Sequence, residues 1–163
     1  MRLRRLAAAF LLTFTVTGCS DDEPAPEPAS SSNEEANPDA TLPSAVLRAV
    51  APAHLRDACP GGHFTRTDDV LGTFPDEYAG RAKQLLSYDC DDLADQMVWA
   101  AMPDADLAGE AAEHADGAPT FVAGSTVLVL APRLVDEAGL DVAGFFEALA
   151  GSCGCGSEIR SGP

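Results

Sequence analysis

The stretch Thr120-Phe121-Val122-Ala123-Gly124-Ser125-Thr126-Val127-Leu128-Val129-Leu130 carries the strongest β-strand signal in the chain. Aromatic and β-branched residues, which are frequent in strands, lie on both sides of Gly124-Ser125. A two-residue connection that begins with glycine is typical of a β-hairpin turn. The sequence therefore predicts two antiparallel strands within residues 120–130.

Two further strands are expected earlier in the chain. Gln84–Cys90 alternates weakly between apolar and polar residues, which predicts a strand. Ala94–Met102 fits either a strand or a helix capped by Asp91 or Asp92. The strand is favoured, because Pro103-Asp104 immediately supplies a better helix start.

Helices are predicted where apolar residues recur at helical spacing. Ser44 is a plausible N-cap of a short helix that Pro52 breaks or kinks. A second helix is expected over about Asp104–His114, and a third begins after Asp141 and ends at Gly151.

The stretch from the turn at Cys59-Pro60-Gly61-Gly62 to Pro75 is expected to be irregular, apart from a short element at Val70-Leu71. The resulting order is strand, strand, helix, strand, strand, helix. It predicts an α+β fold, with a small antiparallel sheet of about four strands, helices packed on one face and disulfides as staples.

The first residues have the pattern of an export signal. Arg2, Arg4 and Arg5 precede an uncharged, mostly apolar run, Leu6–Thr17, which is too short to span a membrane. The run ends in Val16-Thr17-Gly18-Cys19.

These four residues resemble the lipobox of bacterial lipoproteins. The resemblance implies that residues 1–18 are a cleaved signal peptide and that the signal peptidase recognises Val16, Thr17 and Gly18. It also implies that Cys19 receives the lipid, which would attach the protein to the outer face of the cytoplasmic membrane. The alternative is an ordinary secretory signal in which the cysteine is a coincidence.

Residues 19–42 have the composition of a tether. Ser20–Leu42 holds seven acidic residues and no basic one, together with four prolines and a serine run. Such a segment buries too little apolar surface to offset its ordering entropy, so it is expected to be disordered. Residues 43–163 then form one folded domain.

The charge balance excludes two classes of partner. The 163 residues include ten basic and 26 acidic side chains, a formal net charge of −16. Nucleic acids and anionic membrane surfaces are both recognised by clustered Lys and Arg. We therefore expect no nucleic-acid binding, and contact with the membrane through the lipid alone.

Four cysteines remain after Cys19, which favours two disulfides in an exported domain. Cys153 and Cys155 would close a very small ring together. We therefore expect each of them to reach back separately, one to Cys59 and the other to Cys90.

Other chemistry for these residues stays open. Cys153-Gly154-Cys155 is also the pattern of a redox dithiol, although it follows a predicted helix C-terminus, which disfavours a thiolate. Cys59 and His63 with the C-terminal cysteines could bind a metal. A separate group of acids offers oxygen ligands for calcium. These acids are Asp89, Asp91, Asp92 and Asp95.

No enzyme signature accompanies these features. Gly124-Ser125 lacks the pattern of a nucleophile elbow, and no glycine-rich phosphate loop with lysine is found. The Cys-terminated strand, the next strand, Pro103-Asp104-Ala105-Asp106-Leu107 and the hairpin are similar to extracellular sensor-type domains of actinobacterial Ser/Thr kinases. We expect a non-enzymatic binding or sensor-accessory module of the cell envelope, with an unknown ligand or partner and no cofactor. The alternative is an extracytoplasmic thiol redox protein.

Overall fold

The computed structural model describes residues 37, 39–68, 70, 72–91, 93–155 and 158–160. The chain divides into two units, Met1–Asn33 and Glu34–Pro163, and all described residues belong to the second. The predicted signal segment, the lipobox and most of the predicted tether lie outside the described residues.

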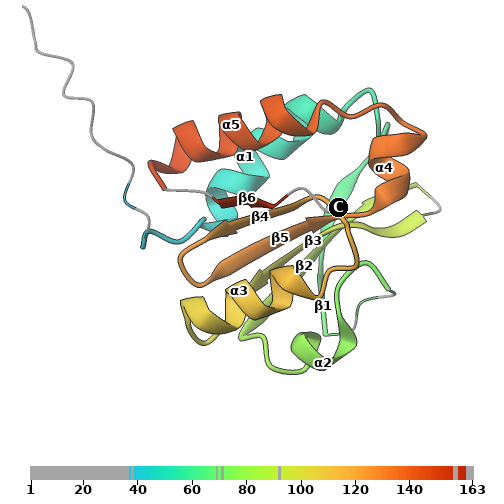
Figure 1. Cartoon of the computed structure of the whole chain (residues 1–163). Coiled ribbons are helices and arrows are strands. Elements are labelled where there is room, and N and C mark those ends of the chain that lie inside the picture. Colours follow the sequence, from blue (N-terminus) through green and yellow to red (C-terminus); the bar gives the residue numbers. More distant parts are fainter. Residues whose placement is uncertain are drawn as a thin grey trace, which may run out of the picture. The chain divides into compact units, whose positions relative to one another are not determined.

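An antiparallel sheet of six strands, in the order β1-β2-β3-β5-β4-β6, forms the centre of the folded unit (Figure 1). The strands are β1 (His63–Thr67), β2 (Gln84–Cys90), β3 (Leu93–Ala101), β4 (Thr120–Ala123), β5 (Thr126–Leu130) and β6 (Glu158–Arg160). The predicted hairpin is confirmed as β4 and β5, and the ambiguous segment after residue 93 is a strand. β3 and β5 lie in the middle of the sheet, where each has a partner on both sides.

Helices cover both faces of this sheet. They are α1 (Ser44–Leu55), α2 (Asp76–Ala79), α3 (Ala105–Glu113), α4 (Pro132–Asp136) and α5 (Val142–Cys153). α1 and α5 lie together over one face, and α3 lies over the other (Figure 1). Two hydrophobic cores result. The first core contains Leu86, Trp99 and Leu128. The second core contains residues next to these in the chain, such as Leu85 and Val127, whose side chains point to the other face of the sheet.

The predicted α+β class with an antiparallel sheet and disulfides is confirmed, and two details need correction. The sheet has six strands instead of about four, and helices pack on both faces instead of one. The reason lies in β5, where every residue from Thr126 to Leu130 is buried. Because successive side chains of a strand point to opposite faces, a fully buried strand needs cover on both sides.

Local capping signals positioned α3 and α5 well. The carboxylate of Asp104 accepts a hydrogen bond from the Leu107 amide at 2.8 Å, and that of Asp141 accepts one from the Gly144 amide at 3.1 Å. Each side chain satisfies one of the unpaired N–H groups at a helix N-terminus. Both helices therefore begin directly after an acidic residue. Asp141 was expected to precede α5, whereas Asp104 was expected to be the first residue of α3 and is its N-cap.

Three local predictions are wrong. α1 is preceded by Pro43 without a side-chain cap, so Ser44 is not its N-cap, and Pro52 does not break the helix, which continues to the fully buried Leu55. α5 does not end at Gly151. It runs to Cys153 and is closed by Gly154, whose φ of 61° is the left-handed conformation that glycine adopts without a steric penalty. The stretch after Gly62, expected to be irregular, forms β1.

The folded unit begins before Pro43. The Asn37 amide donates to the Gly154 carbonyl at 3.1 Å, in an isolated parallel bridge to the chain at residue 155. Leu42 is 1% exposed, and its amide donates to the Thr126 hydroxyl at 2.9 Å. Its carbonyl accepts a hydrogen bond from the indole N–H of Trp99 at 3.2 Å. Leu42 is therefore part of the first hydrophobic core and Ala40 packs against it, whereas Asn37, Asp39 and Thr41 are exposed.

Candidate functional site

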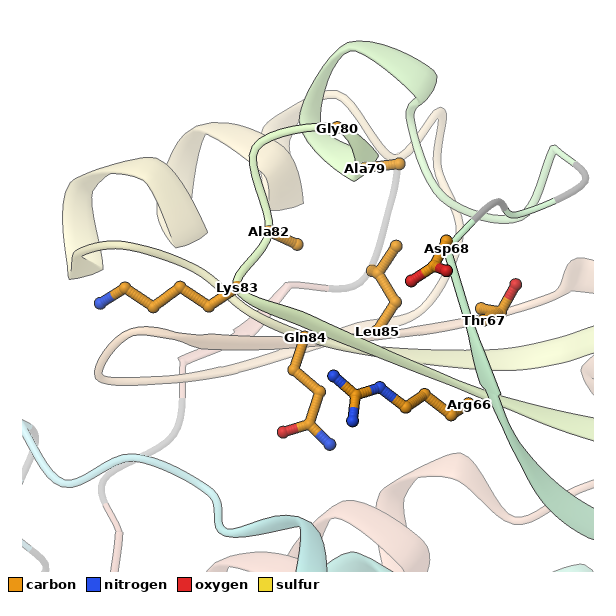
Figure 2. A pocket seen from close by; sticks show the side chains of 9 residues that line it. All are labelled: Arg66, Thr67, Asp68, Ala79, Gly80, Ala82, Lys83, Gln84 and Leu85. Atoms are coloured by element: carbon orange, nitrogen blue, oxygen red, sulfur yellow. The ribbon is translucent and has the colours of Figure 1, made fainter.

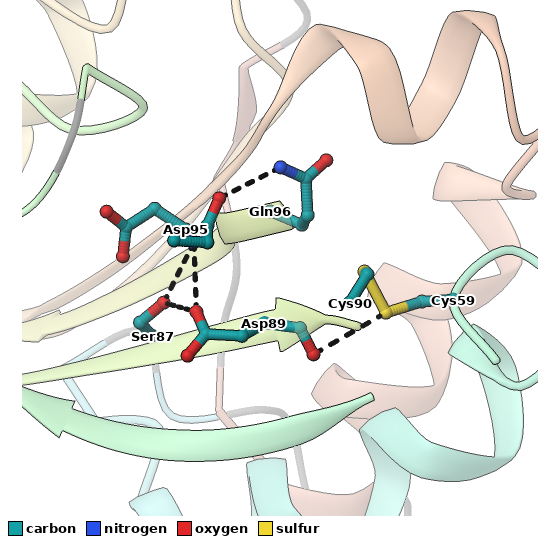
Figure 3. Close-up of a disulfide and its surroundings, with 7 residues drawn as sticks. Cys59, Ser87, Asp89, Cys90, Asp95 and Gln96 are labelled. Carbon is teal, nitrogen blue, oxygen red and sulfur yellow. Dashed lines mark hydrogen bonds between the residues drawn. A yellow bond between two sulfur atoms is a disulfide. The ribbon is translucent and has the colours of Figure 1, made fainter. Parts of the chain in front are cut away.

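A disulfide joins Cys59, beyond the end of α1, to Cys90, the last residue of β2 (Figure 3). The two Cα atoms are 5.2 Å apart, and Cys59 is 1% exposed. The prediction that these cysteines bond separately to the C-terminal pair is therefore wrong. The reason is the unpredicted strand β1, which begins soon after Cys59 and aligns His63 with Asp89, so that the turn before β1 lies beside the end of β2.

The second disulfide joins Cys153 to Cys155. This pairing was the least expected one, because it closes a very small ring. Their Cα atoms are 5.1 Å apart, and the left-handed Gly154 between them reverses the chain. Cys155 is fully buried, whereas Cys153 is half-buried. The Cys155 amide donates to the Cys153 sulfur at 3.3 Å. An incoming thiol would therefore meet Cys153 before Cys155.

These two bonds use the thiols that a metal site would need. With Cys59, Cys90, Cys153 and Cys155 all bonded to sulfur, none offers a thiolate. Among the residues that the structure describes, no group of three or more His, Cys, Asp and Glu side chains is placed to hold a metal ion. The arrangement of the cysteines favours stapling over coordination.

The acidic cluster considered for calcium contains a hydrogen-bonded β-bulge (Figure 3). The pairing of β2 with β3 shifts beyond Tyr88, and Asp95 adopts a positive φ of 53°. The Asp95 amide then donates to the carboxylate of Asp89 at 2.9 Å and to the hydroxyl of Ser87 at 3.2 Å. Ser87 also donates to the Asp89 carboxylate. Asp89 thus holds the bulge in place through protein donors, and Asp92 lies outside the described residues.

The electrostatic state of Asp89 follows from these contacts. Burial alone raises the pKa of its carboxyl, since a charge is less stable away from water. Hydrogen bonds from Ser87, the Asp95 amide and Thr65, with the nearby His63, outweigh burial and hold the pKa below its ordinary value. Asp89 is therefore an ionised structural acceptor. The Ser87 hydroxyl donates directly to this carboxylate, whereas the serine of a Ser-His-Asp triad donates to a histidine.

One cavity of about 200 Å³ lies against the Cys59–Cys90 disulfide. Cys90 and Leu134 line it, and at its rim Arg133 is paired with Glu137 at 2.8 Å. Leu93, 38% exposed, also lines it and is the sole exposed large hydrophobic side chain within the described ranges. The two charged side chains that line this cavity, Arg133 and Glu137, are paired with each other. Neither is therefore available to bind a charged ligand there.

A second cavity, of about 210 Å³, opens between the β1–β2 end of the sheet and the turn after α2 (Figure 2). It is lined by Arg66, Thr67, Asp68, Ala79, Gly80, Ala82, Lys83, Gln84 and Leu85. Small residues from α2 and the turn after it line one side, and the polar side chains come from the two strands and from Asp68 and Lys83, which flank them. Sequence reasoning missed this site because it missed β1, whose five residues include one large apolar side chain, Phe64, and so show no apolar alternation.

Comparison with known proteins adds no relative. No family model matches the chain, and no curated protein or solved structure is detectably similar to it. Within the described part of the chain, no helix has the length and apolar character needed to cross a bilayer. Function must therefore be argued from the chain's own residues.

Proposed function

We propose that the protein is an exported lipoprotein, held by lipid on Cys19 at the outer face of the cytoplasmic membrane. The observation that carries the proposal is the pairing of the other four cysteines. All four form disulfides within the folded unit, and structural disulfides persist in oxidising compartments outside the cytosol. Cys19 alone is left over, and it follows the lipobox residues Val16-Thr17-Gly18.

The folded unit then acts as a non-enzymatic binding or sensor-accessory module of the envelope. Two features support this role. The sheet is packed on both faces and stapled between α1 and β2, which makes a rigid platform. A polar cavity opens at one end of that platform, where a few fixed polar groups can provide specificity for a ligand.

The anchoring test compares the full chain with Cys19→Ala in bacteria supplied with a labelled fatty acid. We expect the label on the wild type and on a Cys153→Ala/Cys155→Ala control, with loss of both label and membrane retention in Cys19→Ala. The control keeps the lipobox and changes cysteines elsewhere. Equal labelling of Cys19→Ala and the wild type would contradict lipidation at Cys19.

A second candidate is a thiol–disulfide exchange protein, favoured by the unequal burial of Cys153 and Cys155. A thiolate of an external dithiol would attack the Cys153 sulfur and release Cys155 as a thiolate. The second thiolate of the same dithiol molecule would then attack the sulfur through which that molecule is bonded to Cys153. This step would release Cys153 as a thiolate. The external dithiol becomes a disulfide, and the protein gains two thiols after proton uptake from water.

This candidate is tested by adding stoichiometric dithiothreitol and following the Cys153–Cys155 bond by mass spectrometry of peptides. Exchange predicts that this bond is reduced well before Cys59–Cys90, with an equal amount of oxidised dithiothreitol formed. A Cys153→Ala/Cys155→Ala variant serves as the blank. Simultaneous reduction of both bonds, only after denaturation, would remove the candidate.

A further inference from the structure

The C-terminal end of α5 and the first described residues of the chain meet at Gly154. The amide of Gly154 donates to the Ala150 carbonyl at 3.0 Å, which closes α5. Its carbonyl accepts the hydrogen bond from the Asn37 amide at 3.1 Å. In Figure 1 the segment before α1 accordingly approaches the end of α5. Gly154 therefore links the helix end to the N-terminal segment, residues 37–42.

The position of the Gly154 carbonyl depends on the disulfide ring around it. Cys153 and Cys155 are the two chain neighbours of Gly154, and their bond closes a ring that contains this one residue. Cys155 is fully buried in the first hydrophobic core, whereas Cys153 is half-buried. Two sulfurs that are no longer bonded must separate to van der Waals contact. Because the core holds Cys155, the displacement falls on Cys153 and Gly154, and thus on the carbonyl that binds Asn37.

The attachment at Asn37 is a single hydrogen bond at the surface. Within the described ranges, the hydrogen bonds from residues 37–42 to the rest of the domain lie at the two ends, at Asn37 and Leu42. The amides of Asp39 and Ala40 donate to Asn37 itself. Asn37 is exposed, so water can replace a lost partner of its amide. Leu42 is buried and bonded twice, so the segment stays attached there.

From these contacts we propose that the Cys153–Cys155 bond is a redox switch for the N-terminal segment. The disulfide holds the Asn37 end against the domain, and the reduced dithiol releases it. An external dithiol breaks the bond and becomes a disulfide itself, while its two electrons and two protons convert both cysteines into thiols. The inference rests on the exchange reaction of the second candidate function and adds what that reaction would regulate. In a chain anchored at Cys19, release would lengthen the free segment between membrane and domain.

The test uses the full chain, purified in a non-ionic detergent, before and after treatment with stoichiometric dithiothreitol. Amide hydrogen exchange of Asn37 is followed by NMR, and peptide mass spectrometry identifies the reduced bonds. Reduction of Cys153–Cys155 should accelerate exchange at Asn37 about fivefold to tenfold, as expected for the loss of one hydrogen bond. The fluorescence of Trp99, the single tryptophan of the chain, should not change, because its hydrogen bond to Leu42 stays closed.

Two variants separate the effect of the ring from that of general stability. Cys153→Ala breaks the ring, keeps the buried Cys155 side chain and should show the fast Asn37 exchange without any reductant. Cys59→Ala/Cys90→Ala removes the other disulfide and keeps the ring. It should leave the Asn37 rate within about twofold of wild type, because local opening does not require global unfolding.

Three results would overturn the proposal. Slow Asn37 exchange in the reduced chain or in Cys153→Ala would show that the ring does not hold the segment, and would leave the thiol-exchange candidate standing. Fast Asn37 exchange together with altered Trp99 fluorescence would show general unfolding instead of local release. Resistance of the folded chain to dithiothreitol would remove the exchange candidate and the switch together. Lipidation at Cys19 is tested separately by the acyl label and is untouched by all three.

Discussion

The two disulfides close loops of very different length, so their removal should destabilise the folded unit unequally. Cys59 and Cys90 are 31 residues apart, whereas Cys153 and Cys155 are 2 apart. In the chain-entropy description, stabilisation grows with the logarithm of loop length, giving about 3.7 kcal/mol for the long loop and about 1.2 kcal/mol for the short one. Replacing the first pair by alanine should therefore cost about 2.5 kcal/mol more than replacing the second.

The two double variants each remove two sulfur atoms, but the burial of the two pairs differs. Cys59 and Cys90 are both buried, at 1% and 9% exposure, whereas the fully buried Cys155 is bonded to a half-buried Cys153. The packing loss is therefore larger for the first pair and acts in the same direction as the loop difference. Unfolding in urea, followed by circular dichroism and extrapolated to water, gives both free energies.

Two outcomes would refute this reasoning. Equal losses, or a larger loss for the Cys153–Cys155 pair, would show that the short ring stabilises the native state through its own contacts and not through loop entropy. Peptide mass spectrometry of each variant should also find the remaining disulfide intact. Free thiols in both variants would instead show that the cysteines pair across the two groups, contrary to the structure.

Three further predictions concern side-chain hydrogen bonds. The Asp89 pKa lies below its ordinary value of 3.8, so its stabilising effect is complete above that pH and is lost as the pH falls through the folded-state pKa. Asp89→Asn should therefore lower stability near neutral pH and flatten the acid limb of a stability-against-pH curve; an unchanged acid limb would contradict this. Asp104→Ala should cost about 1 kcal/mol of unfolding free energy through the lost N-cap, measured in urea, whereas no change would refute the cap. Trp99→Phe should cost about 1–3 kcal/mol, because the buried Leu42 carbonyl loses its indole donor, and a loss near zero by the same method would exclude that bond.

The parts of the fold that were predictable depend on short-range signals. The hairpin around Gly124-Ser125 needs only a turn between two apolar runs, and α3 and α5 need only a capping acid before a helical pattern. The burial of both faces was also visible in the run Val127–Leu130, whose continuous apolar character indicates a central strand.

The parts that were missed depend on contacts between distant residues. β1 is an edge strand with three of its five residues exposed, so it lacks the apolar alternation of a half-buried strand. Its existence follows from pairing with β2, about twenty positions later, and the Cys59–Cys90 bond follows from that pairing. The cavity lined by Arg66 and Gln84 depends on the same register, and so it too was hidden from the sequence.

The attachment of residues 37–42 has a mechanical consequence. A pull transmitted from the chain before Asn37 loads the bond to the Gly154 carbonyl first, as a single bridge. The next resistance comes from Leu42, where a buried side chain and two hydrogen bonds must give way together. Once the bridge at Asn37 opens, the five residues up to Leu42 can extend to at most about 17 Å while Leu42 stays buried. Under force, the attachment at Asn37 would thus give way before the attachment at Leu42 and before the domain unfolds.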